Sequence, residues 1–366
     1  MKVAFYLDEM NFRGVANSTY LYALNNIRLL KNRSYIFYNK KNKRNKREVI
    51  NKFKKKFITF GVSTFKEIDS YHKNYNFDFL YVQKGGEKDS WSSKEIKTVV
   101  HSMYPQKLKE VHGFKYAFIS EWLSLKFSNN KVPHVPYIVE TFNSNDDLKK
   151  KYNIKKNYLV LGCHGGESSF DLKFTKDAII KTIETRKDIV FLFLNINKFF
   201  NHPRIKFIKG TSDEKLKRKF INSCDFMIYG RSLGESFGLA CGEFAIQNKP
   251  IISYKFNRHN SHKYNCLNKN FIEYSSFNSL FKILVNLKKI KKVKKKISKY
   301  HYYKTKKIMQ LFKKVFLVKE KKVRFSFFDY LTNYKNFLFM NYLYLRHKLY
   351  NHYYNYIWSK INNFRY

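Results

Sequence analysis

Short apolar runs, each followed by a segment with helical spacing, recur along most of this chain, and this alternation limits the fold most strongly. Such a rhythm is typical of parallel β-sheets whose two faces are covered by helices, so the chain is predicted to be an α/β protein with doubly wound sheets. The runs expected to form strands are 2–7, 35–38, 57–60, 77–83, 97–101, 116–120, 157–161, 189–194, 205–209, 226–229 and 250–253. A length of 366 residues suits two domains of ordinary size.

The charge of the chain is strongly positive. Lys and Arg number 73 against 27 Asp and Glu, which gives a formal net charge of +46. Lys, Asn, Tyr, Phe and Ile are abundant together, and their A/T-rich codons explain part of this bias. The charge still favours anionic partners such as nucleotide diphosphates or anionic lipid. Nucleic acid is a weaker candidate, because no recognised nucleic-acid motif is present.

The cysteines indicate a reducing compartment. The four of them, Cys163, Cys224, Cys241 and Cys266, form no C-x-x-C pair, so buried free thiols are expected. The chain shows no signal-peptide pattern and no apolar run long enough to span a bilayer, and we therefore expect a cytoplasmic protein, with peripheral membrane association left open. No metal site is predicted, since His259, His262 and Cys266 stand isolated in a polar segment.

A pair of glutamates marks the most informative segment, GESFGLACGE at 234–243. The run 226–229 is predicted to be a buried strand, 230–234 the turn after it, and 237–246 a helix. Amide groups at 236–239 would then face out of a helix N-terminus, where unpaired N–H groups and the helix dipole favour an anion. Two carboxylates beside an anion site suit a ligand with both a diphosphate and hydroxyls, as in a nucleotide sugar.

This segment resembles the E-x7-E motif of retaining GT-B glycosyltransferases of the family 4, glycogen-synthase-like group. The likeness covers about twenty residues, since Phe-Gly-Leu stands between the glutamates and Lys-Pro-Ile-Ile follows at 249–252. It implies a GT-B architecture, in which two Rossmann-like domains face a cleft. The domains would be 1–150, on the acceptor side, and 151–323, which holds the nucleotide sugar, followed by a basic, aromatic helical tail at 324–366.

The resemblance implies metal-independent sugar transfer with retention of configuration and without a dedicated general base or other cofactor. Glu235 would bind donor-sugar hydroxyls, and Glu243 the ribose hydroxyls of the nucleotide. His101, at the end of a predicted strand, takes the position of the histidine that faces the reacting sugar. The backbone of Ser236, Phe237, Gly238 and Leu239 would contact the sugar and diphosphate, and Gly14 would belong to an acceptor-side glycine loop. The acceptor would be a glycan or a lipid-linked molecule.

The chain departs from the family at the phosphate site. An Arg usually follows the first strand of the second domain, with a Lys several residues further on. Here 162–173 reads GCHGGESSFDLK, without an Arg. Gly165 and Gly166 could let their amides approach the phosphates closely. The missing cation could come from His164, Lys173, Lys176 or Arg231.

Each of these residues also has a purely structural interpretation. The glutamates could cap and decorate an ordinary amphipathic helix, Gly14 could be a turn glycine and Arg231 a surface arginine. His101 could be a core or capping residue, with His112 as its nearby competitor.

The tail at 288–366 carries an apolar and aromatic stripe at helical spacing, among lysines. Packing on the body is expected before about residue 318. For 324–366, packing and binding to anionic membrane remain equal alternatives. The alternative function is a non-catalytic basic module with a GT-B shell that binds membrane or nucleic acid.

Overall fold

The computed structural model describes the whole chain except residues 141–143, 267–270, 290–297, 319–322 and 364–366. From residue 358 onward it describes the backbone only. The described chain forms two compact units. Unit 1 comprises Met1–Glu140 with His301–Asn336, and unit 2 comprises Thr141–Tyr300 with Phe337–Tyr366. Each unit therefore combines segments that are far apart in the sequence.

Unit 1 contains a six-stranded parallel sheet. Its strands are β1 (Lys2–Leu7), β2 (Arg33–Asn39), β3 (Ile58–Val62), β4 (Phe79–Lys84), β5 (Lys97–Ser102) and β6 (Lys115–Phe118). The spatial order β3-β2-β1-β4-β5-β6 reverses between β1 and β4, as in a doubly wound sheet. Central strand β1 is buried along nearly its full length, which explains why its sequence, KVAFYL, is continuously apolar after the lysine.

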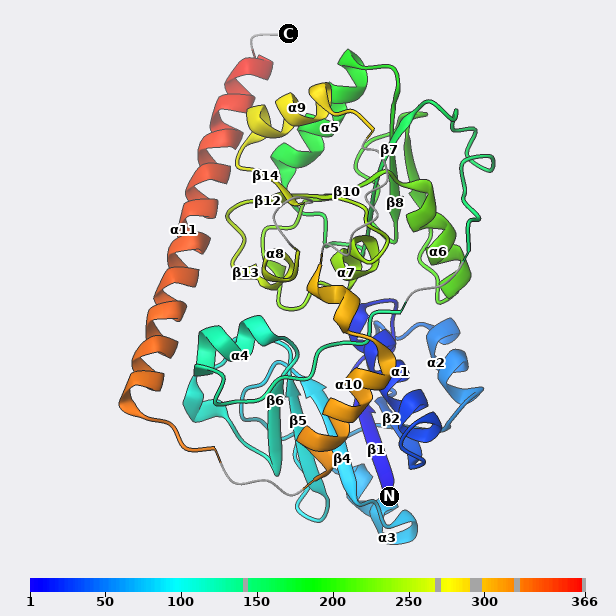
Figure 1. The fold of residues 1–366 in the computed structure, drawn as a ribbon, viewed down its shortest axis with the longest axis vertical. Coiled ribbons are helices and arrows are strands. Elements are labelled where there is room, and N and C mark those ends of the chain that lie inside the picture. Colours follow the sequence, from blue (N-terminus) through cyan, green and yellow to red (C-terminus); the bar gives the residue numbers. More distant parts are fainter. Residues whose placement is uncertain (141–143, 267–270, 290–297, 319–322, 364–366) are drawn as a thin grey trace. The chain divides into compact units, whose positions relative to one another are not determined.

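Helices cover the unit 1 sheet (Figure 1). They are α1 (Gly14–Arg28), α2 (Arg47–Lys54), α3 (Glu67–Tyr75), α4 (Glu121–Ser128) and α10 (Thr305–Phe312), with a short 3-10 turn at Leu108–Glu110 and a π-helical turn at Lys313–Leu317. Helix α10 returns to this unit from late in the sequence, and Phe312 and Phe316 are fully buried. The ring of Phe312 lies 5.2 Å from Tyr22 and 5.5 Å from Tyr81.

The two prolines of the segment 132–139 suggest an interdomain linker, but the segment belongs to the core of unit 1. Val132 and Val135 are fully buried. The Phe118 amide donates to the Pro133 carbonyl at 2.9 Å, and the Val135 amide donates to the Phe118 carbonyl at 2.8 Å. The segment thus extends the sheet edge beside β6, because the prolines leave the intervening backbone groups free to pair.

Unit 2 repeats the arrangement with a second six-stranded parallel sheet. Its strands are β7 (Leu159–His164), β8 (Ile189–Leu194), β9 (Ile205–Ile208), β10 (Phe226–Tyr229), β12 (Ile251–Tyr254) and β14 (Phe271–Tyr274). The order β14-β12-β10-β7-β8-β9 reverses between β7 and β10. A separate parallel pair joins β11 (Gly234–Glu235) to β13 (His259–Asn260).

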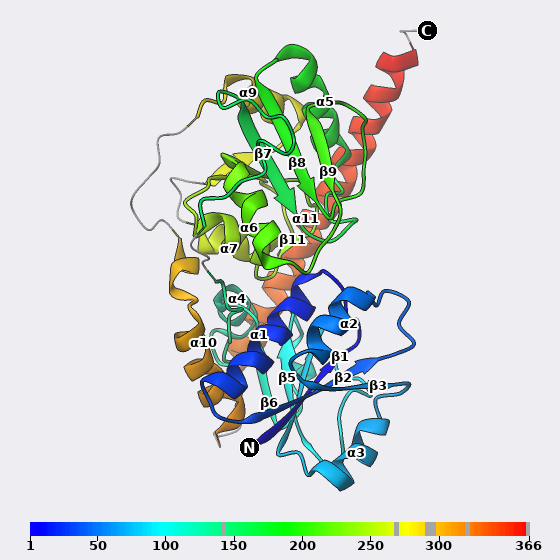
Figure 2. The same ribbon diagram turned by 90° about the vertical axis from the view of Figure 1, so that its right-hand side faces the viewer.

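The helices of unit 2 lie on both faces of its sheet (Figure 2). They are α5 (Lys173–Thr185), α6 (Glu214–Ser223), α7 (Leu239–Ala245), α8 (Ser261–Asn265) and α9 (Phe277–Asn286), with a 3-10 turn at Lys299–Tyr302. Helix α6 is capped by Asp213, whose side chain accepts from the Lys215 amide, and α9 by a capping box between Ser276 and Ser279.

A 37-residue helix, α11 (Phe327–Asn363), closes the chain and contributes residues to both units. No helix within the described residues, α11 included, combines the length and the apolar character needed to cross a bilayer. Before residue 318 the expected packing is confirmed, since Ile308, Phe312 and Phe316 are buried. The expected stripe positions 290, 293 and 297 lie outside the described residues.

Asparagine occupies many of the left-handed backbone positions at which glycine is usually found. Every non-glycine residue found at positive φ in the described chain is an asparagine, apart from Lys31. Asn76 ends α3 at φ 50° and Asn129 ends α4 at φ 48°. Asparagine tolerates the left-handed conformation better than most residues with a side chain, so it can terminate helices in a chain of 13 glycines.

The predicted α/β class with two doubly wound sheets is confirmed. Strands β1, β8 and β10 have the predicted bounds, and the others shift by a few residues. The sequence did not predict β11, β13, β14, α8 or α9, because these elements are short or lie in polar segments. The helix expected at 237–246 begins at Leu239 instead, because Gly238 at φ 84° interrupts the helical backbone.

Candidate functional site

The reversal of strand order in unit 2 lies between β7 and β10, which pair through Leu161 and Phe226. In doubly wound sheets, ligands bind at the carboxyl ends of the strands, at such a reversal. His164 and the two glycines after it leave β7 at this edge, while Gly230 and Arg231 leave β10. The sequence motif with Glu235 and Glu243 follows directly, so the fold delivers it to the edge where a ligand is expected.

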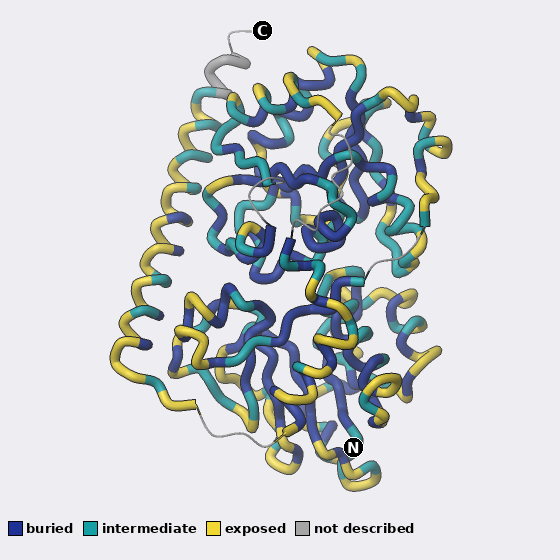
Figure 3. The backbone as a smooth tube through the Cα atoms, in the orientation of Figure 1, coloured by how far each residue is buried: buried dark blue, intermediate teal, exposed yellow. Residues whose placement is uncertain are grey.

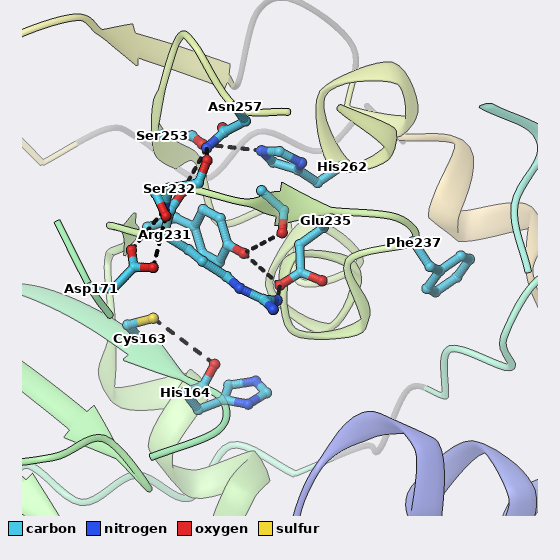
Figure 4. Close-up of polar contacts among 12 residues, drawn as sticks. Cys163, His164, Asp171, Arg231, Ser232, Glu235, Phe237, Ser253, Asn257 and His262 are labelled. Carbon is cyan, nitrogen blue, oxygen red and sulfur yellow. Dashed lines mark hydrogen bonds and ion pairs between the residues drawn. The ribbon is translucent and has the colours of Figure 1, made fainter. Parts of the chain in front are cut away.

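Arg231 and Glu235 form the centre of this edge (Figure 4). The Arg231 guanidinium donates to Oε1 of Glu235 at 3.0 Å, and the Tyr229 hydroxyl donates to the same oxygen. Attraction to Glu235 raises the pKa of Arg231 above its ordinary value, against the opposing effect of burial. The pair is therefore a fixed cation beside a fixed anion, four residues apart.

Several backbone contacts hold this pair in place. Strand β11 carries Glu235 and pairs with β13 through Asn260. The Asn257 side-chain amide donates to the Arg231 carbonyl at 2.6 Å. Asp171 accepts from both the amide and the hydroxyl of Ser232, at 2.7 and 2.8 Å. The loop after β10 is thus tied on both sides, which favours one geometry for Arg231.

Glu243 lies in a second ionic cluster, on α7. Its Oε1 accepts from the Lys217 ammonium at 2.7 Å, and its Oε2 lies 2.9 Å from Nε2 of His164. Lys217 also pairs with Glu214 at 2.7 Å. Burial alone would raise the pKa of Glu243, but Lys217 and His164 outweigh burial and lower it to about 2. Glu243 is therefore held ionised: Oε1 accepts from Lys217, whereas Oε2 lies close to His164 without a well-aligned hydrogen bond.

We expect this cluster to make the free energy of unfolding depend on pH in the acidic range. The pKa of Glu243 falls from an ordinary 4.5 to about 2 on folding, so its contribution is complete above pH 4.5 and is lost as the pH falls towards 2. The shift corresponds to about 3 kcal/mol. In thermal denaturation, the Tm gap between wild type and Glu243→Gln should narrow as pH falls from 5 to about 3. A constant gap would argue against the ionised cluster.

The glycines of the motif are required by close packing. An added Cβ at Gly234, whose φ is 71°, would come within 2.1 Å of the His259 carbonyl. At Gly242 it would meet the Tyr300 ring at 2.8 Å, and at Gly238 the Tyr300 hydroxyl at 2.9 Å. Tyr300 thus packs directly on the start of α7, and only glycine leaves room for it.

The expected anion site at Ser236–Leu239 is altered by the later start of α7. Ser236 and Phe237 precede the helix, and Leu239 is its first residue. The Phe237 ring is buried and stacks edge-on against Tyr300, whose hydroxyl donates to the Phe237 carbonyl at 2.6 Å. Figure 4 shows this ring pointing away from Arg231 and Glu235. The side chain of Phe237 therefore supports the fold, and only its backbone can serve a ligand.

The other residues proposed for phosphate binding occupy different surroundings. Gly165 and Gly166 follow β7, and the Asn195 side chain donates to the Gly165 carbonyl at 2.6 Å. Lys173 begins α5, where its ammonium pairs with Asp177 at 2.8 Å and lies over the Tyr354 ring. Lys173 is thus engaged on the side of α5 that meets α11, whereas Arg231 lies just before the motif and pairs with its first glutamate, Glu235. No group of three His, Cys, Asp or Glu side chains in the described chain is arranged to hold a metal ion.

No protein-family model and no curated protein sequence matches this chain. Similarity is found among solved structures. A glycosyltransferase from Rickettsia africae ESF-5 aligns over 96% of this chain and 98% of its own, at 14% identity and a TM-score of 0.57. Anabaena HepE in complex with UDP and glucose aligns over 86% and 95%, at 11% identity and a TM-score of 0.56. The fold is GT-B. At such low identity the likeness establishes the fold alone.

One further match bears on chemistry that this GT-B fold can host. A candidate UDP-N-acetylglucosamine 2-epimerase from Listeria monocytogenes aligns over 89% of this chain and 99% of its own, at 10% identity and a TM-score of 0.55. The same architecture therefore occurs in proteins named for different reactions, and the function has to be argued from the residues of the site.

In unit 1 of the GT-B fold, His101 is fully buried. One ring nitrogen lies 2.6 Å from the Tyr81 hydroxyl and the other 2.9 Å from the Val135 carbonyl. Burial lowers its pKa to about 3, so the ring is neutral. Strand β5 continues one residue beyond it, to Ser102. These contacts are those of a core histidine. A role at the reacting sugar stays a prediction, and it requires one of these bonds to break.

The remaining unit 1 candidates are Gly14 and His112, and Gly14 begins a helix instead of lying within the expected glycine loop. Gly14 is the first residue of α1, in the connection from β1, next to the reversal of strand order in that sheet. His112, the competitor of His101, is half-buried, with Nδ1 lying 2.6 Å from the Glu110 carbonyl. The contacts of Gly14 and His112 do not bear on their proposed roles, which stay predictions.

Sequence reasoning missed three residues that shape the unit 2 site. Lys217 lies in a helix that is rich in lysine, so nothing marks it as the partner of Glu243. Tyr229 was assigned to a buried strand, without a role for its hydroxyl. Tyr300 lies 58 residues after Gly242, and only the glycine spacing hints that a bulky ring packs there.

Proposed function

We propose that the protein is a glycosyltransferase that moves a sugar from a nucleotide-diphosphate sugar to an acceptor, with retention of configuration. The observation that carries the proposal is the Arg231–Glu235 pair at the carboxyl edge of the unit 2 sheet, in which Glu235 belongs to the motif 234–243 and Arg231 lies three residues before it. A donor of this class has a diphosphate for the cation and sugar hydroxyls for the carboxylate. HepE, which shares the GT-B fold, was solved with UDP, with UDP and glucose, and with UDP-glucose.

In this proposal Glu235 accepts hydrogen bonds from donor-sugar hydroxyls and stabilises positive charge developing at the anomeric carbon. Tyr229 and Arg231 orient its carboxylate through the contacts on Oε1. Charge-assisted bonds of this kind each contribute about 1.5–3 kcal/mol. Because the surrounding loop is already tied down, little reorganisation is needed when the donor binds.

Arg231 takes the place of the arginine that is absent after β7. Its guanidinium neutralises the diphosphate as the bond from the anomeric carbon to the phosphate oxygen breaks. The acceptor hydroxyl forms the new bond on the same face, and its proton passes to the leaving phosphate oxygen. No side chain then has to act as general base, which is compatible with the buried, hydrogen-bonded state of His101.

Glu243 keeps the role toward the ribose that the resemblance implies, but it does so as a member of an ionic cluster. A ribose hydroxyl would have to share its carboxylate with Lys217 or His164. We propose that a nucleotide contacts this cluster as a unit, with Glu243 accepting from ribose and His164 lying close to the phosphates, next to the amides of Gly165 and Gly166. A lipid-linked or glycan acceptor remains part of the proposal.

The test is a panel of UDP-, GDP- and ADP-sugars, followed first by thermal shift and then by release of the nucleoside diphosphate. Sugars that carry one of the three bases should raise the Tm of the wild type. Arg231→Met should weaken binding of the corresponding nucleoside diphosphate, whereas its affinity for the nucleoside alone should be nearly unchanged. The control Arg258→Met removes a guanidinium that stacks on the Tyr344 ring and should bind as the wild type does. Equal nucleoside diphosphate affinity in Arg231→Met would contradict the assigned role.

The same panel separates two other functions. The alternative raised by the charge is a non-catalytic GT-B module, and the observation that favours it is the exposed apolar surface of α11. Lack of turnover with every donor would support that alternative. Conversion of a donor into its epimer without any acceptor would instead relate the chain to the epimerase-named structure.

A further inference from the structure

Helix α11 is apolar on the face that points away from the protein. Within unit 2 the exposed positions include Leu338, Tyr342, Leu345, Leu349, Tyr353 and Tyr356, and their side chains are 51–71% exposed. Their spacing of three and four residues places them in one stripe along the helix. Figure 3 shows exposed positions recurring along the described length of α11. Single exposed apolar residues are common, but a continuous stripe indicates an interaction surface.

The opposite face of the helix is already used for packing. Met340 and Leu343 are buried. The Tyr350 ring stacks edge-on against Phe174 at 5.1 Å, and the Tyr354 hydroxyl donates to Asp177 at 2.9 Å. Met340 and Leu343 are three residues apart, Tyr350 follows two helical turns later and Tyr354 four residues after that, so all four lie on one face. The stripe is therefore a second apolar face, which unit 2 leaves in solvent.

The charge on this part of the chain selects the partner. From Tyr330 to the end, the sequence contains no Asp or Glu, while Lys335, Arg346, Lys348, Lys360 and Arg365 are basic. Arg346 and Lys348 lie on exposed positions beside the stripe. A second copy packed on the stripe would bring like charges together, whereas an anionic surface would be attracted.

The residue types in the stripe also suit a membrane surface. Three of its members are tyrosines, whose rings are apolar and whose hydroxyls remain hydrated at the headgroup level. Among the described residues, α11 is not apolar enough to be a membrane span. A helix with an apolar stripe flanked by cations lies in the plane of the interface instead.

We propose that the exposed stripe of α11 in unit 2 docks on anionic phospholipid bilayers. The helix lies parallel to the surface, with the leucines inserted among the acyl chains and the flanking cations at the headgroups. This binding does not depend on the proposed transferase activity. It places the docking surface on α11, whereas the segment of the tail before residue 318 packs within unit 1.

Co-sedimentation of the full chain with vesicles tests the proposal. We expect binding to vesicles of phosphatidylcholine mixed with phosphatidylglycerol, weaker binding as salt rises, and little binding to phosphatidylcholine alone. Leu345→Gln with Leu349→Gln should reduce the partition coefficient by about tenfold or more. Both positions are exposed, so the double variant should fold, as an unchanged Tm would verify.

The matched control is Leu29→Gln with Leu125→Gln, which changes two exposed leucines of unit 1. It should bind vesicles as the wild type does. Wild-type binding by the stripe variant, or failure of the wild type to bind phosphatidylglycerol vesicles, would overturn the proposal. A wild-type dimer that the stripe variant abolishes would assign this face to a second copy instead.

Discussion

Replacing Glu235 with glutamine should lower kcat for the preferred nucleotide sugar by about 10²–10³-fold, the range found when one preorganised group that stabilises a transition state is removed. Glutamine keeps the shape of the side chain but removes the negative charge that, in the proposed function, faces the anomeric carbon. It also leaves the Arg231 guanidinium without its ionic partner. Because the proposed role of the carboxylate is to act on the sugar, affinity for the free nucleoside diphosphate should change little.

Steady-state kinetics with nucleotide affinity measured by calorimetry separate these effects. Glu273→Gln is the matched control, since Glu273 is a unit 2 glutamate whose own cation partner, Lys263, is a surface residue. Its kcat should equal that of the wild type. If Glu235→Gln kept full turnover, Glu235 would lose its place at the reacting sugar.

Lys217→Met should lower the free energy of unfolding by about 3–5 kcal/mol, because it leaves the Glu243 carboxylate buried without its main cation. His164 offsets only part of the loss, as it is the second of two partners. Adding Glu243→Gln to Lys217→Met should recover part of the stability, since the unpaired charge is then gone. Urea denaturation of the two single variants and the double variant measures this coupling.

Lys219→Met is the control on the same helix. Lys219 pairs with Asp146 at the surface, where an ion pair contributes about 0–1 kcal/mol. A loss in Lys217→Met no larger than in this control would contradict the buried cluster. A double variant whose loss in free energy of unfolding equals the sum of the two single losses would also contradict the buried cluster.

The sequence was sufficient for the parts of the fold that depend on local pattern. Apolar runs such as 189–194 are buried on both faces, so their composition alone marks them as strands. The segment 226–246 also indicated a strand, a turn and a helix in the right order. What the sequence lacked were contacts between distant segments. Tyr300 on Gly242 and Lys217 on Glu243 join residues that no local pattern relates.

The start of α7 illustrates the remaining difficulty. Apolar spacing from Phe237 onward is compatible with a helix, but Phe237 is buried by Tyr300 from another part of the chain. The helix begins after Gly238, whose left-handed backbone interrupts it, and Tyr300 leaves no room for a side chain at that position. His101 is similar, since a histidine near a strand end can face a ligand or fill a core. Tyr81 and Val135 provide its partners, and neither is adjacent in sequence.

The division of the chain into units also has a consequence for biosynthesis. Unit 1 takes its last helix from residues 301–336, and Phe312 stacks on Phe5 from the first strand. While the chain emerges from the ribosome, the residues of unit 2 are made before the core of unit 1 can be completed. Part of the apolar face of the amino-terminal sheet therefore stays uncovered until more than three hundred residues have been synthesised.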